Sequence, residues 1–304
     1  MDEHYVDQVR LLLRVLPDIA AEEVFALKGG TAINLFYREM PRLSVDIDLA
    51  YLPVDEREKS LRDIDETLKR IAAAIGERNP GVEAHRIAGG GNNDTRILVR
   101  EGAVRVKVET SPVTRGTVCA PVTKRTSDAV TEHFGFVETR VVAFEDLYGG
   151  KLHAALDRRH PRDLFDIKLL YENEGITDEL FRVFMVYVAS SGRPMHELLG
   201  STAGIDEHLY ETQFVGMTRE AVPMEALVET QERLHADIAE RLTGDISTFL
   251  LRLHDAEPDF DLIGLPDAVN LPAVGWKLLN LEALKEKDQR KHSGQREALE
   301  ALLQ

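Results

Sequence analysis

The N-terminal half of the chain alternates between helix-like and strand-like spacing of its apolar residues. Val6–Leu16 carries apolar side chains three and four positions apart, which predicts a helix that ends at Pro17 and is followed by a short second helix. Glu56–Ile75 has the period of an amphipathic helix. Short strands are expected at Val24–Leu27, Ser44–Leu49, Val82–Ala88, Thr95–Val99, Ala103–Glu109 and Phe136–Ala143, with a turn at residues 89–93.

The second half is predicted to be mostly helical. Helix-period segments are Phe144–Leu156, Arg162–Tyr171, Asp178–Ala189, Pro223–Leu242 and Asp245–His254. Strand-like sequence nearly disappears beyond Asn173–Thr177, so we expect two domains, residues 1–174 and 175–304. Pro272–Leu281 is expected to be a buried segment with Trp276 and Leu278 in the core. The pattern as a whole predicts an α/β (α+β) protein with a small mixed, twisted sheet, flanking helices and a helical C-terminal half.

Composition narrows the class of protein. The 304 residues include 53 acidic and 37 basic side chains, a net charge of −16 that argues against a broad nucleic-acid-coating surface or a polybasic membrane anchor. The single cysteine excludes an intramolecular disulfide framework and fits a reducing compartment. Neither a membrane-length apolar run nor a signal-like N-terminus is present, so we expect a cytoplasmic protein with no membrane partner.

A glycine turn, Lys28-Gly29-Gly30-Thr31, follows the strand expected at Val24–Leu27. We expect Thr31 to cap a helix that runs to about Tyr37. Glycines let backbone N–H groups approach a phosphate, and the positive end of the following helix favours an anion there. The alternative is a tight turn that packs a helix on a strand, and the spacing of a Walker loop is absent.

Two aspartates alternate within the next expected strand. Asp46 and Asp48 would share one face with Ser44, while Ile47 points to the other. Aspartate is depleted in strands, and such departures concentrate at functional sites. Because Mg²⁺ is commonly held by one or two carboxylates and substrate phosphates, we assign both aspartates as metal ligands. The alternative is a solvated strand face.

A third carboxylate, Glu109, ends a neighbouring expected strand on its polar face, with Arg105 and Lys107. It is a candidate ligand for a second metal ion, one that would lie beside a hydroxyl group attacking a nucleotide phosphate. The alternative is that Glu109 is the cross-strand partner of an arginine or lysine.

A third group of polar residues lies in the sequence between Phe144 and Leu170. Lys151 is one turn after Leu147 on one expected helix, and Asp163 and Asp166 share a face of the next. A lysine there would neutralise a triphosphate, and the acidic pair would orient the lysine or contact the nucleotide. Ordinary helix surface charges are the alternative.

Residues around this lysine add two further expectations. Tyr148-Gly149-Gly150 weakens the helix and would permit close approach of a ligand. His153, Arg158, Arg159 and His160 would add local positive potential for a nucleic acid end.

These motifs together resemble the AbiEii family of nucleotidyltransferase toxins, which belongs to the DNA polymerase beta-like superfamily and to type IV toxin–antitoxin systems. The resemblance is carried by Lys28–Ala32, Arg42–Leu49, Lys151, Arg162–Asp166 and Trp276–Asn280.

The resemblance implies a nucleotidyltransferase-type sheet and transfer of a nucleoside monophosphate from an NTP, with Mg²⁺ or Mn²⁺. The acceptor it implies is RNA, the tRNA 3′ end, and the partner a separate antitoxin of the AbiEi type, in toxin–antitoxin or phage-defence systems. The catalytic candidates are Asp46, Asp48, Lys151, Asp163 and Asp166. The nucleotide- and phosphate-binding candidates are Lys28, Gly29, Gly30, Thr31, Arg42 and Ser44, and the metal candidates are Asp46, Asp48 and Glu109.

Other acceptors and a non-catalytic role are open at this point. The acceptor could be a protein or a small molecule such as an aminoglycoside, or the chain could be a nucleotide-sensing or partner-binding module. The net charge of −16 disfavours RNA unless it is locally reversed. We expect that reversal in a basic groove near Lys151–Lys168, helped by a stripe over Lys285–Arg296.

Overall fold

A computed structural model of the chain describes residues 3–88, 94–201 and 203–304, so the turn expected at residues 89–93 lies outside the described residues. None of the helices within these ranges combines the length and the apolar character that a membrane span requires.

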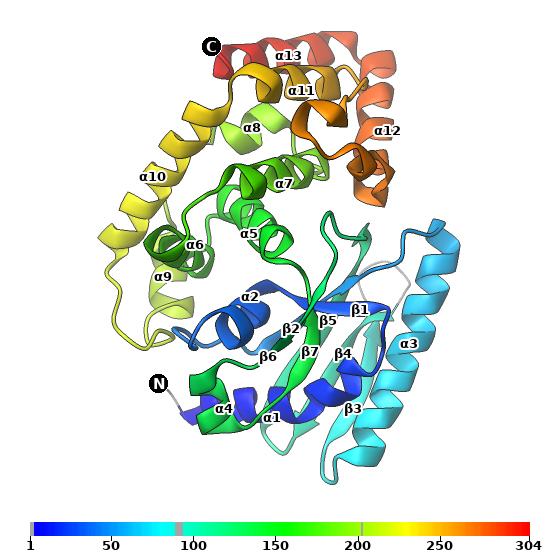
Figure 1. Cartoon of the computed structure of the whole chain (residues 1–304), viewed down its shortest axis with the longest axis vertical. Coiled ribbons are helices and arrows are strands. Elements are labelled where there is room, and N and C mark those ends of the chain that lie inside the picture. Colours follow the sequence, from blue (N-terminus) through cyan, green and yellow to red (C-terminus); the bar gives the residue numbers. More distant parts are fainter. Residues whose placement is uncertain (1–2, 89–93, 202) are drawn as a thin grey trace. The chain divides into compact units, whose positions relative to one another are not determined.

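The packing of the chain separates two compact units (Figure 1). Met1–Ala143 and Val215–Ala221 form the first, which we call the sheet unit. Phe144–Phe214 and Val222–Gln304 form the second, the helical unit. The domain boundary expected between residues 174 and 175 stays a prediction.

The strands of the sheet unit form one seven-stranded sheet in the order β3-β4-β5-β2-β1-β7-β6. β1 runs antiparallel to β2 and parallel to β7, and β2 runs parallel to β5, so the sheet is mixed, as predicted. Its strands are β1 (Phe25–Lys28), β2 (Asp46–Tyr51), β3 (Glu83–Ala88), β4 (Asp94–Glu101), β5 (Val104–Arg115), β6 (Val122–Arg125) and β7 (Glu138–Val141). The strand that carries the two aspartates, β2, is therefore flanked on both sides.

Two helices cover one face of this sheet. α1 (Glu3–Ala20) packs on β5, and α3 (Arg57–Arg78) packs on β3 and β4. The strand residues that alternate toward them are buried: Ile47, Leu49, Ile97, Val99, Val106 and Val108. Burial of each such side chain stabilises the fold by about 1.5–3 kcal/mol. The polar residues between them consequently lie on the opposite face of the sheet.

The first helix does not end at Pro17, as the sequence predicts, and no second helix follows it. α1 runs through Pro17 to Ala20. Proline removes one backbone N–H donor, but Leu16 and Ile19 on either side of it are both buried. Apolar packing therefore outweighs the lost hydrogen bond.

The expected capping role of Thr31 is also wrong. Helix α2 (Gly29–Ala32) begins before Thr31, its N-cap residue is Lys28, and no side chain caps it. A π-helical turn, η1 (Ile33–Tyr37), continues the segment, and α4 (Asp128–Phe134) completes the helices of the sheet unit. Thr31 is fully buried and bonds to the neighbouring strand instead, as described below.

The helical unit is built around the hairpin of α5 (Phe144–Arg158) and α6 (Pro161–Asn173), with α7 (Asp178–Ala189) packed on α5. The remaining helices are α8 (Met195–Leu199), α9 (Glu207–Gln213), α10 (Met224–Arg241), α11 (Gly244–His254), α12 (Pro272–Lys287) and α13 (Gln289–Leu302), with the 3₁₀ turns η2 (Phe260–Ile263) and η3 (Pro266–Asn270). The helical second half is thus confirmed, with boundaries close to those predicted.

The glycines before Lys151 make room for the Tyr187 ring. A Cβ at Gly149 would lie 3.1 Å from the Tyr187 ring, and one at Gly150 would lie 3.2 Å from it. The Tyr187 hydroxyl group donates to Asp146 Oδ1 at 3.0 Å, which ties α7 to α5. The space that the sequence suggested for a ligand is therefore occupied by the Tyr187 ring.

The burial expected for Pro272–Leu281 is reversed at its centre. The Trp276 side chain is 58% exposed, Leu278 is only partly buried, and Lys277 between them is 5% exposed. The Lys277 Nζ donates to the backbone carbonyl of Arg193 at 2.6 Å. The apolar period of α12 alone does not reveal this, because a lysine is the residue that this helix turns inward.

Candidate active site

Four charged residues form one row across the sheet. Lys28 of β1 lies opposite Asp48 of β2, and Asp48 lies opposite Glu109 of β5. Arg96 of β4 lies opposite Glu109 and extends the row. Residues directly opposite each other in a sheet point to the same face. The row therefore reads cation, carboxylate, carboxylate, cation, on the face away from α1 and α3.

Asp46 lies on the same face, two positions before Asp48 and opposite Lys107 of β5. Both aspartates are partly exposed, whereas Ile47 between them is fully buried. The alternation predicted from the sequence is thus the alternation of the strand. Two hard carboxylate ligands facing the same way fit Mg²⁺ or Mn²⁺ that also binds substrate oxygens. No group of three or more His, Cys, Asp or Glu side chains in the described chain is arranged to hold a metal ion by itself.

Both glycines of the turn are required by close approach of site residues. Gly29 has a positive φ of 74°, and a Cβ there would overlap the Asp48 carboxylate. A Cβ at Gly30 would lie 2.7 Å from Arg42 Nη2 and 2.8 Å from Ser44 Oγ. Since contacts below about 3 Å are not tolerated, any side chain here would displace the residues around it. The Gly-Gly pair therefore packs the turn against the aspartate strand.

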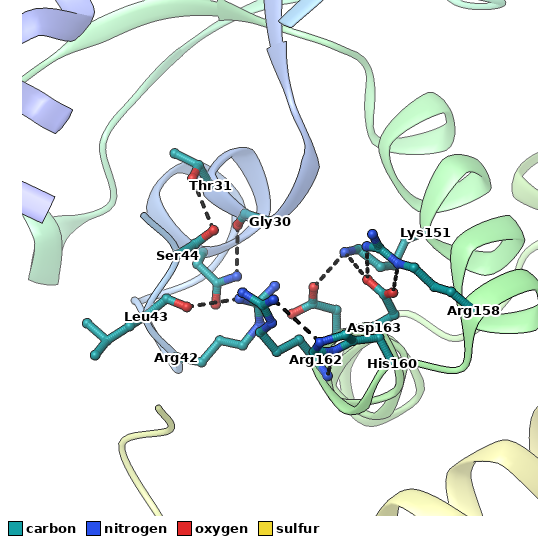
Figure 2. Close-up of polar contacts among 12 residues, drawn as sticks. Gly30, Thr31, Arg42, Leu43, Ser44, Lys151, Arg158, His160, Arg162 and Asp163 are labelled. Atoms are coloured by element: carbon teal, nitrogen blue, oxygen red, sulfur yellow. Dashed lines mark hydrogen bonds and ion pairs between the residues drawn. The ribbon is translucent and has the colours of Figure 1, made fainter. Parts of the chain in front are cut away.

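A buried polar network fixes the turn to the start of β2 (Figure 2). Thr31 Oγ1 donates to the backbone carbonyl of Asp46 at 2.5 Å, and it also lies within hydrogen-bond distance of Ser44 Oγ, at 3.0 Å. Asn34 Nδ2 donates to the Gly30 carbonyl at 2.8 Å. Buried hydrogen bonds between the turn and the strand restrict both to one relative position. Thr31 and Ser44 consequently set the position of the Asp46 backbone.

Arg42 is 2% exposed and lies beside this network. Its Nη1 donates to the Leu43 carbonyl at 2.9 Å (Figure 2). At the start of the turn, burial lowers the pKa of Lys28, and the negative charge of Asp48 opposes that effect. The sheet unit thus brings together all the phosphate-binding candidates of the sequence with Asp46 and Asp48. Their contact with a nucleotide stays a prediction.

Glu109 pairs with basic residues, which is the alternative that the sequence left open. It forms an ion pair with Arg96 through Oε1, and its Oε2 lies 2.7 Å from Lys107 Nζ. The hydrogen bond to Glu109 raises the pKa of Lys107, partial burial opposes the rise, and the charge of Asp46 adds to it. Glu109 is therefore the cross-strand partner of Arg96 and also pairs with Lys107 of its own strand, and its role as a metal ligand stays a prediction.

The helical unit holds a second charged cluster, buried between α5 and α6. Lys151 Nζ lies 2.8 Å from Asp163 Oδ1 and 3.0 Å from Asp166 Oδ2 (Figure 2). The exposed fractions of these side chains are 7%, 2% and 0% in that order. The interpretation of these residues as surface charges is therefore wrong. Two carboxylates hold one ammonium group in a fixed position.

Arg158 completes the pairing of Asp163. Its Nε lies 2.6 Å from Asp163 Oδ2 and its Nη2 lies 3.0 Å from Oδ1, a bidentate contact. Burial alone would raise the pKa of Asp163, but the Lys151 charge and the Arg158 guanidinium hold it well below its usual range. Asp163 is consequently ionised at neutral pH.

His160 does not add the positive charge expected of it. It is the N-cap residue of α6, and its Nδ1 accepts from the Arg162 backbone N–H at 3.1 Å. Its Nε2 lies 3.1 Å from Gln213 Oε1. Burial lowers its pKa, although the bond to Gln213 opposes this. A histidine that accepts through Nδ1 and donates through Nε2 is neutral.

The structure thus joins the sequence candidates into one cluster in each unit. The sequence did not predict that Arg96 pairs with Glu109 or that Arg158 binds Asp163. A signal for the first was present, because basic residues share one face of each strand, Arg96 and Arg100 in β4 and Arg105 and Lys107 in β5. No signal in the sequence gives the second, since Arg158 ends its helix among other charges.

Comparison with known proteins gives two findings. The family model described as "Nucleotidyl transferase AbiEii toxin, Type IV TA system" matches residues 10–278. A solved structure, MenT4, a nucleotidyltransferase toxin from Mycobacterium tuberculosis H37Rv, superposes with a TM-score of 0.60 at 19% identity, covering 91% of this chain and 92% of that one. This likeness shows a shared fold. Among curated proteins no sequence matches the chain. Because the family match spans most of the chain, the protein is a member of the AbiEii family of nucleotidyltransferases, the toxins of type IV toxin–antitoxin systems.

Proposed function

We propose that this nucleotidyltransferase uses Mg²⁺ or Mn²⁺ and transfers a nucleoside monophosphate from an NTP to RNA, at a tRNA 3′ end. The observation that carries the metal assignment is the placement of Asp46 and Asp48, both partly exposed, on one face of the sheet beside the Gly29-Gly30-Thr31 turn. A bound divalent cation would neutralise the charge of the triphosphate there. Glu109, opposite Asp48, is the proposed third ligand.

The chemistry is a single displacement at the α-phosphorus of the NTP. A hydroxyl oxygen of the acceptor forms the new P–O bond, the bond to the β-phosphate oxygen breaks, and pyrophosphate leaves. The hydroxyl proton passes to water. The backbone N–H groups of the Gly29–Thr31 turn would hold the phosphates, because they stand at the start of α2 with no side chain capping them.

The buried cluster of the helical unit would act on the nucleotide through Lys151. Two of the three N–H donors of its ammonium group are directed at Asp163 and Asp166. We assign the remaining donor to the nucleotide, with Asp163 and Asp166 as the residues that orient it. Arg158 fixes Asp163 in turn.

A type IV toxin has an antitoxin partner. We propose an antitoxin of the AbiEi type and a role in phage defence, both of which rest on the family alone. The cellular test is growth arrest on expression of the chain, relieved by a neighbouring gene product. Arrest by the D46N variant would contradict a toxicity that depends on transfer.

The enzymatic test follows label from each α-³²P-labelled NTP in a reaction with total RNA and a cell lysate. We expect label in RNA, dependence on added Mg²⁺ or Mn²⁺, and loss of transfer in D46N and D48N. The control is D7N, which has the same change of charge at an exposed residue paired with Arg10. Label in a protein or in a small molecule such as an aminoglycoside would overturn the RNA acceptor. Equal transfer by D46N, D48N and D7N would overturn the metal assignment.

A further inference from the structure

The face of the sheet that carries Asp46 and Asp48 extends outward across the β4–β5 hairpin. Beyond the ion pair of Arg96 with Glu109, the register places Arg100 of β4 directly opposite Arg105 of β5. Side chains at every second position share a face. Arg96, Arg100, Arg105 and Lys107 therefore lie on the face of the two aspartates, and we call these four residues the basic face.

Burial supports this assignment. Ile97, Val99, Val106 and Val108, which alternate with the basic residues, are buried under α1 and α3. By contrast, the side chain of Arg96 is 47% exposed and that of Lys107 is 40% exposed. Arg100 and Arg105 are exposed as well.

The outer end of the basic face, at Arg100 and Arg105, reverses the charge of the chain locally. The carboxylates beside the four cations are Glu109, which pairs with two of them, and Glu83 of β3, which lies opposite Arg100. Glu83 also lies 3.5 Å from His85 Nε2. Asp46 and Asp48 also lie on this face, so cations exceed carboxylates only at its outer end, where Arg100 and Arg105 face Glu83 in a chain whose net charge is −16. The overall composition does not predict a local excess of positive charge, so this excess points to a functional role.

The pair of Arg100 and Arg105 points to an anionic occupant. Like charges directly opposite each other destabilise a sheet, and the one carboxylate that the register places beside this pair, Glu83, lies opposite Arg100 alone. A local rule broken with only part of the charge balanced marks a functional position. Arg100 Nε donates to the Gly102 carbonyl at 2.8 Å, which fixes its orientation without neutralising it. A phosphate between the two guanidinium groups would remove the repulsion through charge-assisted hydrogen bonds.

The position of this face selects a nucleic acid as the occupant. Lys107 lies opposite Asp46, so a strand bound along the basic face would lead to the aspartates. An acidic protein bound to the basic face would gain nothing from reaching the two aspartates. The alternative groove proposed from sequence is weaker, because Lys151 is buried and Lys168 pairs with Glu172.

We propose that the basic face binds the phosphate backbone of the single-stranded RNA acceptor and directs its 3′ end to Asp46 and Asp48. This inference rests on the proposed function in that the acceptor is RNA. Arg100 and Arg105 would contact phosphates upstream of the reacting end, whereas Lys107 would lie next to it.

The test compares R100Q/R105Q with R57Q/R62Q, which makes the same change of charge at two exposed positions of α3. Binding of a fluorescent RNA with a single-stranded 3′ end is measured at several salt concentrations, together with NTP affinity. We expect R100Q/R105Q to weaken RNA binding about tenfold or more and to lower the slope of log affinity against log salt by about 1–2, since each lost phosphate contact lowers it by about 0.7–0.9. R57Q/R62Q should match the wild type, and NTP affinity should be equal in all three.

The outcomes separate this inference from the proposed function. Equal RNA affinity and salt slope in R100Q/R105Q and R57Q/R62Q would overturn the basic face as an RNA site, even if label still reaches RNA. Loss of binding to an acidic protein partner in R100Q/R105Q, with RNA binding intact, would overturn it in favour of a protein interface. Failure of transfer to RNA by the wild type, with RNA binding that depends on Arg100 and Arg105, would contradict only the proposed acceptor chemistry.

Discussion

The Asp48 carboxylate occupies the space that a side chain on Gly29 would fill. The turn and the aspartate strand are therefore matched in shape, and β1 and β2 meet at Lys28 and Asp48 with no room between them. Gly29 also has a positive φ of 74°, a conformation that side chains rarely adopt.

G29A should consequently lower both stability and activity. The positive φ costs about 1–2 kcal/mol for a residue with a Cβ, and displacement of Asp48 should reduce transfer by at least tenfold. The control is G76A within α3, where a Cβ meets no neighbour within 4 Å. Helix propensity predicts that G76A is more stable by about 0.5–1 kcal/mol. Urea denaturation and label transfer check both, and wild-type transfer by G29A would contradict the close fit.

The buried pairing of Lys151 predicts that its removal destabilises the helical unit. K151M leaves the Asp163 and Asp166 carboxylates without this cation, which costs about 3–5 kcal/mol for a buried pair. K168M, which breaks the exposed pair with Glu172, should change the free energy of unfolding by less than about 1 kcal/mol. Both are measured by chemical denaturation.

A second variant keeps the role of Lys151 testable. K151M/D166N removes one of the two carboxylates together with the cation, so it should recover part of the lost stability. If K151M and K151M/D166N are equally stable, the pairing does not account for the cost. Transfer activity is then compared only among variants that melt as the wild type does.

The sequence predicted most of the sheet, and the shared face of Asp46 and Asp48 within it, because both depend on short-range alternation. Asp46 and Asp48 share a face in any strand, and Ile47 and Leu49 of β2 are buried on the other. The strand begins at Asp46 and not at Ser44, as the sequence predicted, because Ser44 is held by its contact with Thr31. The predicted end of the first helix at Pro17 failed because burial of residues such as Ile19 was not visible locally. Local pattern gives the element, and packing decides where it ends.

Features that depend on contacts between distant residues could not be predicted. Tyr187 fills the space above Gly149 and Gly150, although nothing near either glycine indicates it. Trp276 was expected in the core by its chemistry, but α12 turns Lys277 inward to reach a carbonyl of Arg193. A buried lysine is a rare choice, so pattern-based reasoning selects the tryptophan instead.

Lys277 gives a pH dependence with a defined sign. Burial lowers its pKa from 10.5 to about 8 in the folded chain. Between these values the unfolded chain binds the proton and the folded chain does not, so the free energy of unfolding rises with pH through this window. Below pH 8 the cost of burying the charge is fully present.

We therefore expect the free energy of unfolding of the wild type to rise by about 3 kcal/mol relative to that of K277M between pH 8 and 10.5. Loss of the hydrogen bond to Arg193 in K277M adds an offset that does not change over this range. K287M, at an exposed position near the end of α12, should track the wild type at every pH. Parallel stability curves of wild type and K277M, measured by denaturation at each pH, would show that Lys277 is not buried in its charged form.

The last prediction concerns the two partners of Glu109. If Glu109 binds metal, its carboxylate must leave Arg96 and Lys107, so metal and cations compete for the same oxygens. E109Q should then raise the Mg²⁺ concentration for half-maximal transfer by about tenfold or more. R96Q removes one competitor and should lower that concentration, a shift in the opposite direction that a general loss of structure would not give. Metal titrations of E109Q, R96Q and the control R62Q measure this. An unchanged Mg²⁺ requirement in E109Q, with normal folding, would leave Glu109 as a cross-strand partner only and Asp46 and Asp48 as the whole protein contribution to the metal site.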